Sequence, residues 1–155
     1  MYSKILVAVD GSGISAHALK QAITLARKLK AQLRIVHVVD MNWFPLAPEL
    51  NIDIQTISAV RRSVGESIIA AARDSAKQER FEAEVALLET DSPAQQVAEA
   101  ITQEAQRWPA DMMVLGTHGH RGFQRLMLGS VAEQTARRSV MPVLLIPSPE
   151  HTHSD

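Results

Sequence analysis

The amino-acid sequence predicts a single doubly wound α/β domain with a five-stranded parallel sheet and helices on both faces. Short apolar runs rich in β-branched residues alternate with longer stretches whose apolar residues recur every three or four positions, and this alternation is typical of α/β proteins. The runs are continuously apolar, as in strands buried on both faces of a parallel sheet. The 155 residues, of which 46% are hydrophobic, suit one domain with a substantial core.

The N-terminal segment predicts a β-α-β unit. Residues 4–10, KILVAVD, form a short apolar run that ends at the turn-forming DGSG, so we expect a strand. An amphipathic helix follows, because apolar residues recur at helical spacing: Ala18, Leu19, Ala22, Leu25, Ala26 and Leu29. Residues 32–40, QLRIVHVVD, repeat the strand pattern. Such a unit nearly always crosses over in the right-handed sense, so the two strands are predicted to be parallel.

The middle of the chain predicts a loop, a long helix and an edge strand. Residues 41–51, MNWFPLAPELN, contain two prolines that interrupt any periodicity, which indicates a loop that could act as a lid. Residues 53–80 predict a helix, since apolar side chains repeat at spacings of three and four: Ile57, Val60, Val64, Ile68, Ala71 and Ala72. Residues 82–89, EAEVALLE, predict a strand whose glutamates suit an exposed sheet edge.

The start of the third helix carries a capping pattern. Ser92 is predicted to be the N-cap, Pro93 the first helical residue, and Gln95 the residue that completes a capping box. We expect the helix to continue to about residue 106.

The C-terminal part of the chain completes the alternation. Residues 111–116, DMMVLG, predict a strand, residues 130–139 a helix that ends before a proline, and residues 143–147 a last strand. We therefore expect one domain over residues 1–147, followed by a polar tail of residues 148–155 that frays.

Charge and composition exclude several classes of function. The chain carries 16 Lys and Arg against 17 Asp and Glu, a net charge of -1. This balance provides neither the basic surface that nucleic acids require nor a polybasic membrane anchor. The absence of cysteine excludes disulfides, thiolate metal sites and cysteine nucleophiles. No apolar run approaches the length of a bilayer span, and the N-terminus is unlike a secretory signal, so we expect a cytoplasmic protein.

The segment of residues 116–130, GTHGHRGFQRLMLGS, holds four of the seven glycines and follows a predicted strand. Ligands of open α/β sheets bind beyond the carboxyl ends of the strands, and glycines there let the backbone approach a ligand closely. Gly116 and Gly119 would bring N–H groups near a phosphate. Gly129 and Ser130 would add the N–H donors at the start of the last helix.

A structural role explains the same segment without a ligand. Gly116 and Gly119 could serve only to turn the chain, and Ser130 only to cap the last helix. Arg121 and Arg125 lie between them and would add positive charge if they face a phosphate. The residues alone leave both interpretations open.

Two common nucleotide-binding motifs do not fit this chain. A P-loop needs a lysine between its glycine turn and a serine or threonine, and the sequence contains neither GKS nor GKT. A dinucleotide-binding fingerprint needs three glycines after the first strand, and DGSGIS lacks the third.

The glycine spacing is more specific than either motif. Gly116 and Gly119, followed after nine residues by Gly129 and Ser130, resemble the nucleotide-binding signature of the universal stress protein family. The opening KILVAVDGS and the HVVD that ends the second strand are also similar to that family, so the resemblance covers residues 2–147. The spacing resembles the ATP-binding subclass. The resemblance further implies the sheet order 3-2-1-4-5 for the predicted strands.

The resemblance implies which residues contact an adenine nucleotide. Asp10 matches the acidic residue beside the adenosine, although it could equally be a turn-forming residue before Gly11. The main chain of Val38 matches the position that hydrogen-bonds the adenine edge, and Leu115 and Gly116 match the entrance to the ribose and phosphates. The residues that match the phosphate-binding positions are Gly119, Gly129, Ser130 and Val131.

The chain departs from the family pattern before the third helix. The family often has a glycine before the proline at this point, whereas this chain has Asp91 and Ser92 before Pro93. The carboxylates of Glu89 and Asp91 would repel a phosphate if they faced it.

Metal binding and catalysis have little support in the sequence. His118 and His120 lie two residues apart, but no third ligand has the spacing of a metal motif. Mg²⁺ or Mn²⁺ would instead be carried on the phosphates of the nucleotide. His37 is expected to be a hydrogen-bonded core residue of its strand. Ser12 and Ser130 have no histidine placed to activate them, so robust catalysis is not predicted.

The resemblance favours an ATP-binding universal stress protein that acts as a nucleotide-dependent sensor or adaptor, with slow or no hydrolysis and an unspecified protein partner. ADP or AMP could replace ATP. One alternative is an adenylyl-transferring or hydrolysing ATPase, although DGSGIS matches the required SGGxDS-like loop poorly; another is an interaction protein without nucleotide. The resemblance also favours a homodimer through strand 143–147, an apolar edge whose flanking prolines could instead prevent pairing.

Overall fold

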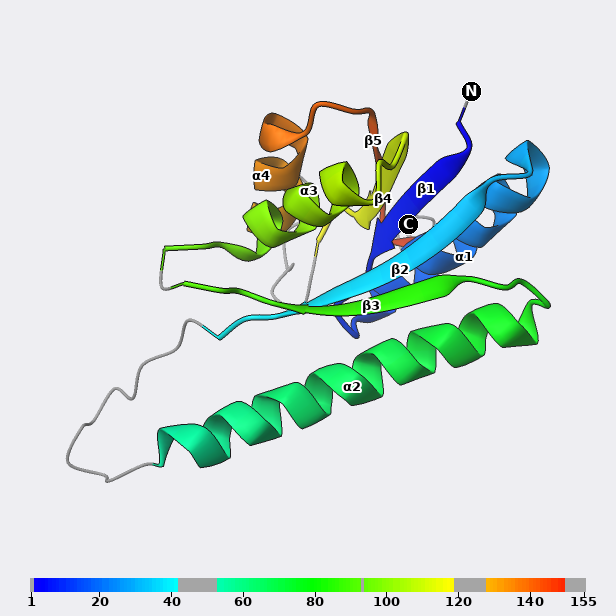
Figure 1. The fold of residues 1–155 in the computed structure, drawn as a ribbon. Helices are drawn as coiled ribbons and strands as arrows, with labels where there is room; N and C mark the ends of the chain where they lie inside the picture. Colours follow the sequence, from blue (N-terminus) through cyan, green and yellow to red (C-terminus); the bar gives the residue numbers. More distant parts are fainter. Residues whose placement is uncertain (1, 42–52, 93, 119–127, 150–155) are drawn as a thin grey trace, which may run out of the picture.

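The computed structural model describes residues 2–41, 53–92, 94–118 and 128–149. They form a parallel sheet of order β3-β2-β1-β4-β5 with helices on both faces (Figure 1), which confirms the predicted fold class and sheet order. The chain passes outward from β1 to β3 and then returns to the other side of β1, so the winding reverses between β1 and β4. The elements are β1 (Lys4–Ala8), α1 (Gly13–Leu29), β2 (Gln32–Val39), α2 (Ile54–Gln78), β3 (Glu84–Glu89), α3 (Val97–Arg107), β4 (Met112–Gly116), α4 (Ser130–Arg138) and β5 (Val143–Ile146).

Some predicted features lie outside the described residues. These are the loop of residues 42–51 with its suggested role as a lid, the tail from residue 150 onward, and Pro93.

The central strand β1 is buried on both faces of the sheet. Successive residues of a strand point to opposite faces, and Ile5, Leu6 and Val7 are all fully buried. Ile5 and Val7 belong to the core beneath α1 and α2, whereas Leu6 belongs to the core beneath α3. The sheet is therefore the middle of three layers, with α1 and α2 on one side and α3 and α4 on the other (Figure 1).

Helix α1 begins where the sequence predicts a turn after the first strand. The hydroxyl of Ser12, the N-cap, accepts a hydrogen bond from the Ser15 N–H at 3.2 Å, which satisfies one of the unpaired donors of the first turn. The helix then buries the predicted apolar side except for Leu25, which is partly buried, and Leu29, which is 42% exposed at the C-terminal end.

Helix α2 shows a different buried face from the one that its periodicity predicted. Val60 and Val64 are 58% and 53% exposed, because the N-terminal half of the helix extends past the sheet (Figure 1). The residues that do pack on the sheet begin at a glycine: Gly65, Ile69, Ala72 and Ala76. A Cβ atom at Gly65 would lie 2.5 Å from Val39 Cγ2, so this glycine permits the helix to lie directly on the end of β2.

Helix α3 begins later than the capping pattern predicted. Its first residue is Val97 and its N-cap is Gln96, which makes no side-chain capping bond; the assignment of Ser92 as the cap is therefore wrong. A separate turn precedes the helix, closed by a hydrogen bond from the Gln95 N–H to the Ser92 carbonyl at 3.1 Å. The Gln95 side chain accepts from the Asp91 N–H at 2.7 Å, so it stabilises this turn rather than the helix start.

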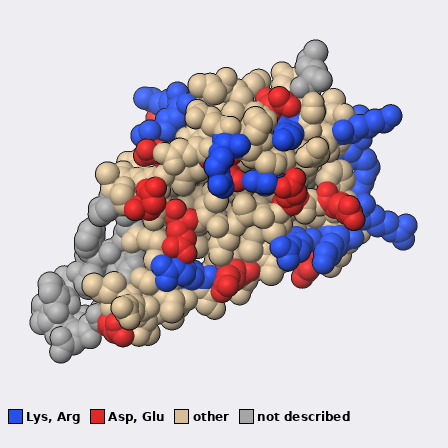
Figure 2. Space-filling view, viewed as in Figure 1, with Lys and Arg blue, Asp and Glu red and all other residues tan. Residues whose placement is uncertain are grey.

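The surface carries charges of both signs. On the face shown in Figure 2, Lys and Arg side chains are interspersed with Asp and Glu, as the near-zero net charge leads one to expect. Among the described helices, none has both the length and the apolar composition needed to cross a bilayer.

We predict that Lys30→Gly increases the free energy of unfolding by up to about 1 kcal/mol, because a left-handed conformation is costly for a residue with a Cβ atom and not for glycine. Lys30 ends α1 with φ 56° and ψ 41°. Urea unfolding measures the change. The matched control, Lys20→Gly within the same helix, should lose about 1 kcal/mol, and a loss of stability in Lys30→Gly as well would contradict the prediction.

Candidate functional site

Three adjacent strands bring the predicted site residues to one edge of the sheet. β1 pairs with β2 on one side and with β4 on the other. Asp10 lies just beyond β1, Val38 near the end of β2, and Gly116 at the end of β4. The carboxyl ends of these strands flank the point where the winding reverses, which is the usual position of ligand sites in open α/β sheets.

Asp10 forms the turn between β1 and α1. Its Oδ1 accepts a hydrogen bond from the Ser12 N–H at 2.9 Å, and its own N–H donates to Ser15 Oγ at 3.2 Å. Gly11 follows with φ 85°, a conformation that glycine adopts without strain. Asp10 therefore has the turn-forming role, and its contact with an adenosine stays a prediction.

The main chain of Val38 faces the space beyond the end of β1. The Val36 carbonyl accepts from the Val9 N–H at 2.9 Å on the β1 side, and alternate residues of a strand direct their N–H and C=O groups to the same side. Val38 therefore directs both groups to that side as well. The pairing of β1 with β2 ends at Ala8 and Val36, and within the described residues no backbone group pairs with Val38 on this side.

Gly116 lies against the first turn of α1. A Cβ atom at this position would be 2.6 Å from Ile14 Cγ2, closer than real Cβ contacts. The glycine therefore has a packing role whether or not a ligand binds. Leu115 is 4% exposed and its side chain packs in the core beneath α3, so its contact with a nucleotide stays a prediction.

The start of α4 offers backbone donors. Gly129 is the N-cap and makes no side-chain capping bond, so the structure corrects the alternative in which Ser130 caps the helix. The Gly129 N–H donates to the Thr117 carbonyl at 2.7 Å and is already used within the protein. The N–H groups of the next three residues have no acceptor among residues 2–41, 53–92, 94–118 and 128–149: Ser130, Val131 and Ala132.

His118 and His37 occupy different environments. His118 is only 9% exposed; its Nδ1 lies 3.0 Å from Thr117 Oγ1, and its Nε2 is buried with no hydrogen-bond partner among the described residues. A buried polar atom of this kind is rare in proteins. His37 Nδ1 lies 2.7 Å from the Val9 carbonyl, as expected of a hydrogen-bonded histidine in the strand, but the residue is only half-buried and not part of the core.

Several residues of the predicted phosphate segment belong to the part of the chain that the structure does not describe. Gly119, His120, Arg121 and Arg125 lie outside the described residues. Within the part of the chain that the structure describes, no group of three or more His, Asp or Glu side chains is arranged to hold a metal ion.

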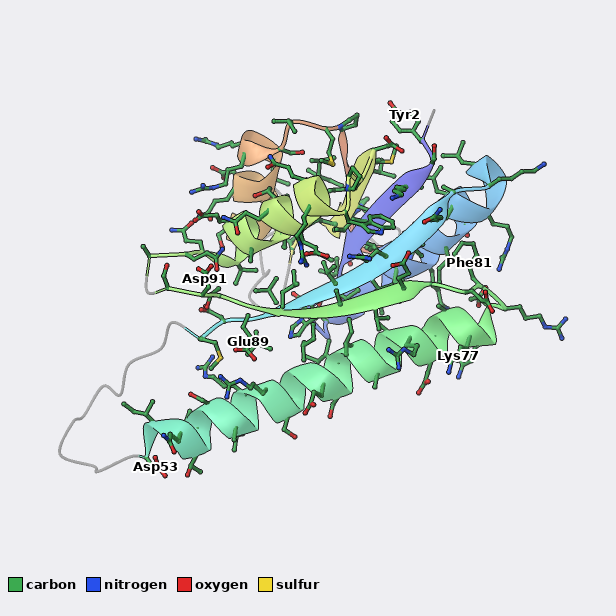
Figure 3. All side chains as sticks on the ribbon, viewed as in Figure 1. Tyr2, Asp53, Lys77, Phe81, Glu89 and Asp91 are labelled. Atoms are coloured by element: carbon green, nitrogen blue, oxygen red, sulfur yellow. The ribbon has the colours of Figure 1, made fainter. Side chains whose placement is uncertain are left out.

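Glu89 ends β3 and Asp91 follows it by two residues (Figure 3). Glu89 Oε2 accepts from Arg62 Nε at 2.7 Å. The hydrogen bond and the charge of Glu89 raise the pKa of Arg62, and the positive charge of Arg62 lies directly against the Glu89 carboxylate. The Asp91 N–H is held by the Gln95 side chain.

The sequence did not predict the contacts of two buried polar residues at this end of the sheet. Thr90 and Gln95 are 6% and 5% exposed. The Thr90 hydroxyl accepts from the Met41 N–H at 2.9 Å, and no local motif marks that contact. Gln95 carried a signal in the capping pattern, although its side chain acts in a different place.

The fold agrees with the outcome of comparison with known proteins. The sequence profile of the universal stress protein family matches residues 1–147. The chain belongs to the universal stress protein family. A universal stress protein of Methanocaldococcus jannaschii is 31% identical over 150 residues, 97% of this chain and 85% of that protein. The crystal structure of a family member from Burkholderia pseudomallei is 33% identical, has a TM-score of 0.75, and covers 95% of this chain and 97% of its own.

Two solved universal stress proteins contain adenine nucleotides. The protein from Archaeoglobus fulgidus in complex with dAMP is 25% identical with a TM-score of 0.63, and the match covers 94% of this chain and 98% of that one. Another, in complex with cAMP, is 26% identical with a TM-score of 0.65, and the match covers 94% and 97%. Adenine nucleotides are therefore among the ligands of proteins that share this fold and family.

We predict that Gly116→Ala lowers the free energy of unfolding by about 1–3 kcal/mol, because the added methyl group overpacks the contact with Ile14. Chemical denaturation measures the loss. The matched control is Gly13→Ala, where a Cβ atom would have no neighbour within 4 Å, and its stability should be unchanged or slightly higher. Equal stability of the two variants would contradict the assigned packing role.

Proposed function

We propose that this universal stress protein binds ATP, or the related ADP or AMP, and acts as a nucleotide-dependent sensor or adaptor in the cytoplasm, with slow or no hydrolysis. The observation that carries the proposal is the convergence on one sheet edge of two sets of backbone groups that have no partner among the described residues: the main chain of Val38 and the N–H groups at the start of α4. The proposed nucleotide contacts are Asp10, Val38, Leu115, Gly116, Gly119, Gly129, Ser130 and Val131.

The chemistry of the two ends of the site suits the two ends of a nucleotide. A main-chain N–H and C=O can pair with the acceptor and donor on an adenine edge. The N–H groups and partial positive charge at a helix N-terminus favour a phosphate. Adenine nucleotides in two related proteins support this ligand class. Among the described residues no carboxylate and histidine cluster could hold a cation, so Mg²⁺ or Mn²⁺ would be carried by the phosphates.

The way in which the hydroxyl groups are used supports the absence of catalysis by an activated serine. The Ser12 hydroxyl accepts the Ser15 N–H to cap α1. Ser130 begins α4, where its main chain would serve a phosphate. The structure pairs neither serine with a histidine within the residues that it describes, as a nucleophile would require.

We predict that Ser130→Pro weakens ATP binding about tenfold, because it removes one N–H donor to an anion. Proline is well tolerated as the first residue of a helix, and Gly129 has the extended conformation, ψ 156°, that precedes proline without strain. Isothermal titration calorimetry measures the dissociation constant.

The control for this prediction is Ser130→Ala, which keeps the N–H and removes only the hydroxyl. Its affinity for ATP should stay much closer to that of the wild type, and both variants should unfold at similar urea concentrations. If Ser130→Pro binds ATP as tightly as the wild type, α4 does not hold the phosphates.

We also propose that two copies of the chain associate through strand 143–147. β5 is an edge strand of the sheet, and Leu144 on it is 39% exposed. An apolar edge strand is a template for pairing with a second chain, and a two-fold dimer would pair the same strand from both copies.

We predict that Leu144→Lys converts a dimer to a monomer, because a charge on an edge strand opposes pairing. Analytical ultracentrifugation gives the mass in solution. Val60→Lys is the control, since Val60 is also an exposed apolar residue, 58% exposed on α2, and should leave the mass unchanged. A wild-type protein of monomeric mass would rule out the proposed dimer.

A further inference from the structure

The main chain that follows Val38 is held at every residue by distant groups. The Val39 carbonyl accepts from the Thr90 N–H at 3.1 Å. The Asp40 carbonyl accepts from Arg61 Nη1, on α2, at 3.0 Å. The Met41 N–H donates to Thr90 Oγ1 at 2.9 Å. Thr90 thus binds the end of β2 twice, once through its main chain and once through its hydroxyl.

Thr90 is itself anchored to the opposite face of the sheet. The N–H of the next residue, Asp91, donates to Gln95 Oε1 at 2.7 Å, and Gln95 Nε2 donates to Gln103 Oε1 on α3 at 3.0 Å. Thr90 and Gln95 are both more than nine-tenths buried. Buried hydrogen-bonded networks of this kind fix one local arrangement of the chain, here the arrangement of the residues after Val38.

The main chain of Val38 differs from that of the three residues that follow it. Each of residues 39–41 has a main-chain group held by a hydrogen bond from Thr90 or Arg61 or to Thr90, whereas the N–H and C=O of Val38 face the end of β1 without a backbone partner among the described residues. Two rigidly held groups, one donor and one acceptor, can distinguish bases. Guanine carries the acceptor O6 where adenine carries the N6 amino donor.

We propose that Thr90 is a positioning residue for base recognition: its hydroxyl holds the end of β2 so that the main chain of Val38 meets the edge of adenine in a fixed geometry. This inference rests on the proposed binding of an adenine nucleotide. Loss of the hydroxyl leaves the Met41 N–H without its acceptor, and the end of β2 gains freedom that binding must then remove. Preorganised groups bind more tightly because they avoid this cost.

The test compares Thr90→Val, which keeps the shape and removes the hydroxyl, with Thr90→Ser, which keeps the hydroxyl. Calorimetry measures the binding of ATP, GTP and inorganic tripolyphosphate to each full-length protein. In Thr90→Val we expect ATP to bind about tenfold more weakly, tripolyphosphate to bind as in the wild type, and the preference for ATP over GTP to decrease. Thr90→Ser should restore the wild-type values to within about twofold.

Hydrogen exchange in the nucleotide-free protein gives a second readout. The Met41 amide should exchange slowly in the wild type and in Thr90→Ser, and faster in Thr90→Val. If Thr90→Val does not fold, Thr90→Ala carries the same comparison, since it also lacks the hydroxyl.

The outcomes separate this inference from the proposed function. Unchanged ATP binding and unchanged Met41 exchange in Thr90→Val would overturn the inference alone. Equal weakening of ATP and tripolyphosphate would also overturn it, because it would reveal a general structural role. A wild-type protein that binds none of the three ligands would overturn the proposed function and this inference together.

Discussion

Burial of β1 on both faces is the constraint on which the rest of the structure depends. Ile5, Leu6 and Val7 are consecutive, fully buried and directed alternately to the two helical layers. Neither layer can be removed without exposing part of this strand to water. Because β1 also pairs with both β2 and β4, the chain must reverse its winding beside it. This packing places the carboxyl ends of β2, β1 and β4 side by side at one edge of the sheet. Main-chain groups beyond those ends are available to a ligand.

At that edge the glycines have structural roles that do not depend on a ligand. Gly116 permits the approach of Ile14, and the N–H of Gly129 is bonded to Thr117. A glycine pattern is therefore insufficient evidence of a phosphate site. The stronger evidence is what remains after the protein's own hydrogen bonds have been counted, because unpaired backbone donors and acceptors are costly unless water or a ligand satisfies them. Within the described residues, Val38 and the first residues of α4 meet that condition.

The sequence predicted the fold class and the sheet order, but it did not predict every contact around the candidate site. Alternating strands and helices and the glycine spacing led to the correct family and sheet order. The buried face of α2 was mispredicted because periodicity does not reveal where a helix leaves the sheet, so the exposed Val60 and Val64 resembled core residues. Thr90 had no signal at all, since its partner Met41 lies 49 residues away and only the pairing of β2 with β3 brings the two together.

A nucleotide that contacts both Val38 and the start of α4 would bridge the two sides of β1. Neither half of such a site is formed by one local segment: β2 supplies one end, and α4, which follows β4 in the chain, supplies the other. A ligand of this kind binds only the folded arrangement, and it stabilises that arrangement by an amount that rises with its free concentration. A higher nucleotide concentration would then increase the fraction of protein molecules in which this surface is ordered. That conversion would require no bond cleavage, so a site of this kind could report on nucleotides to a partner without catalysis.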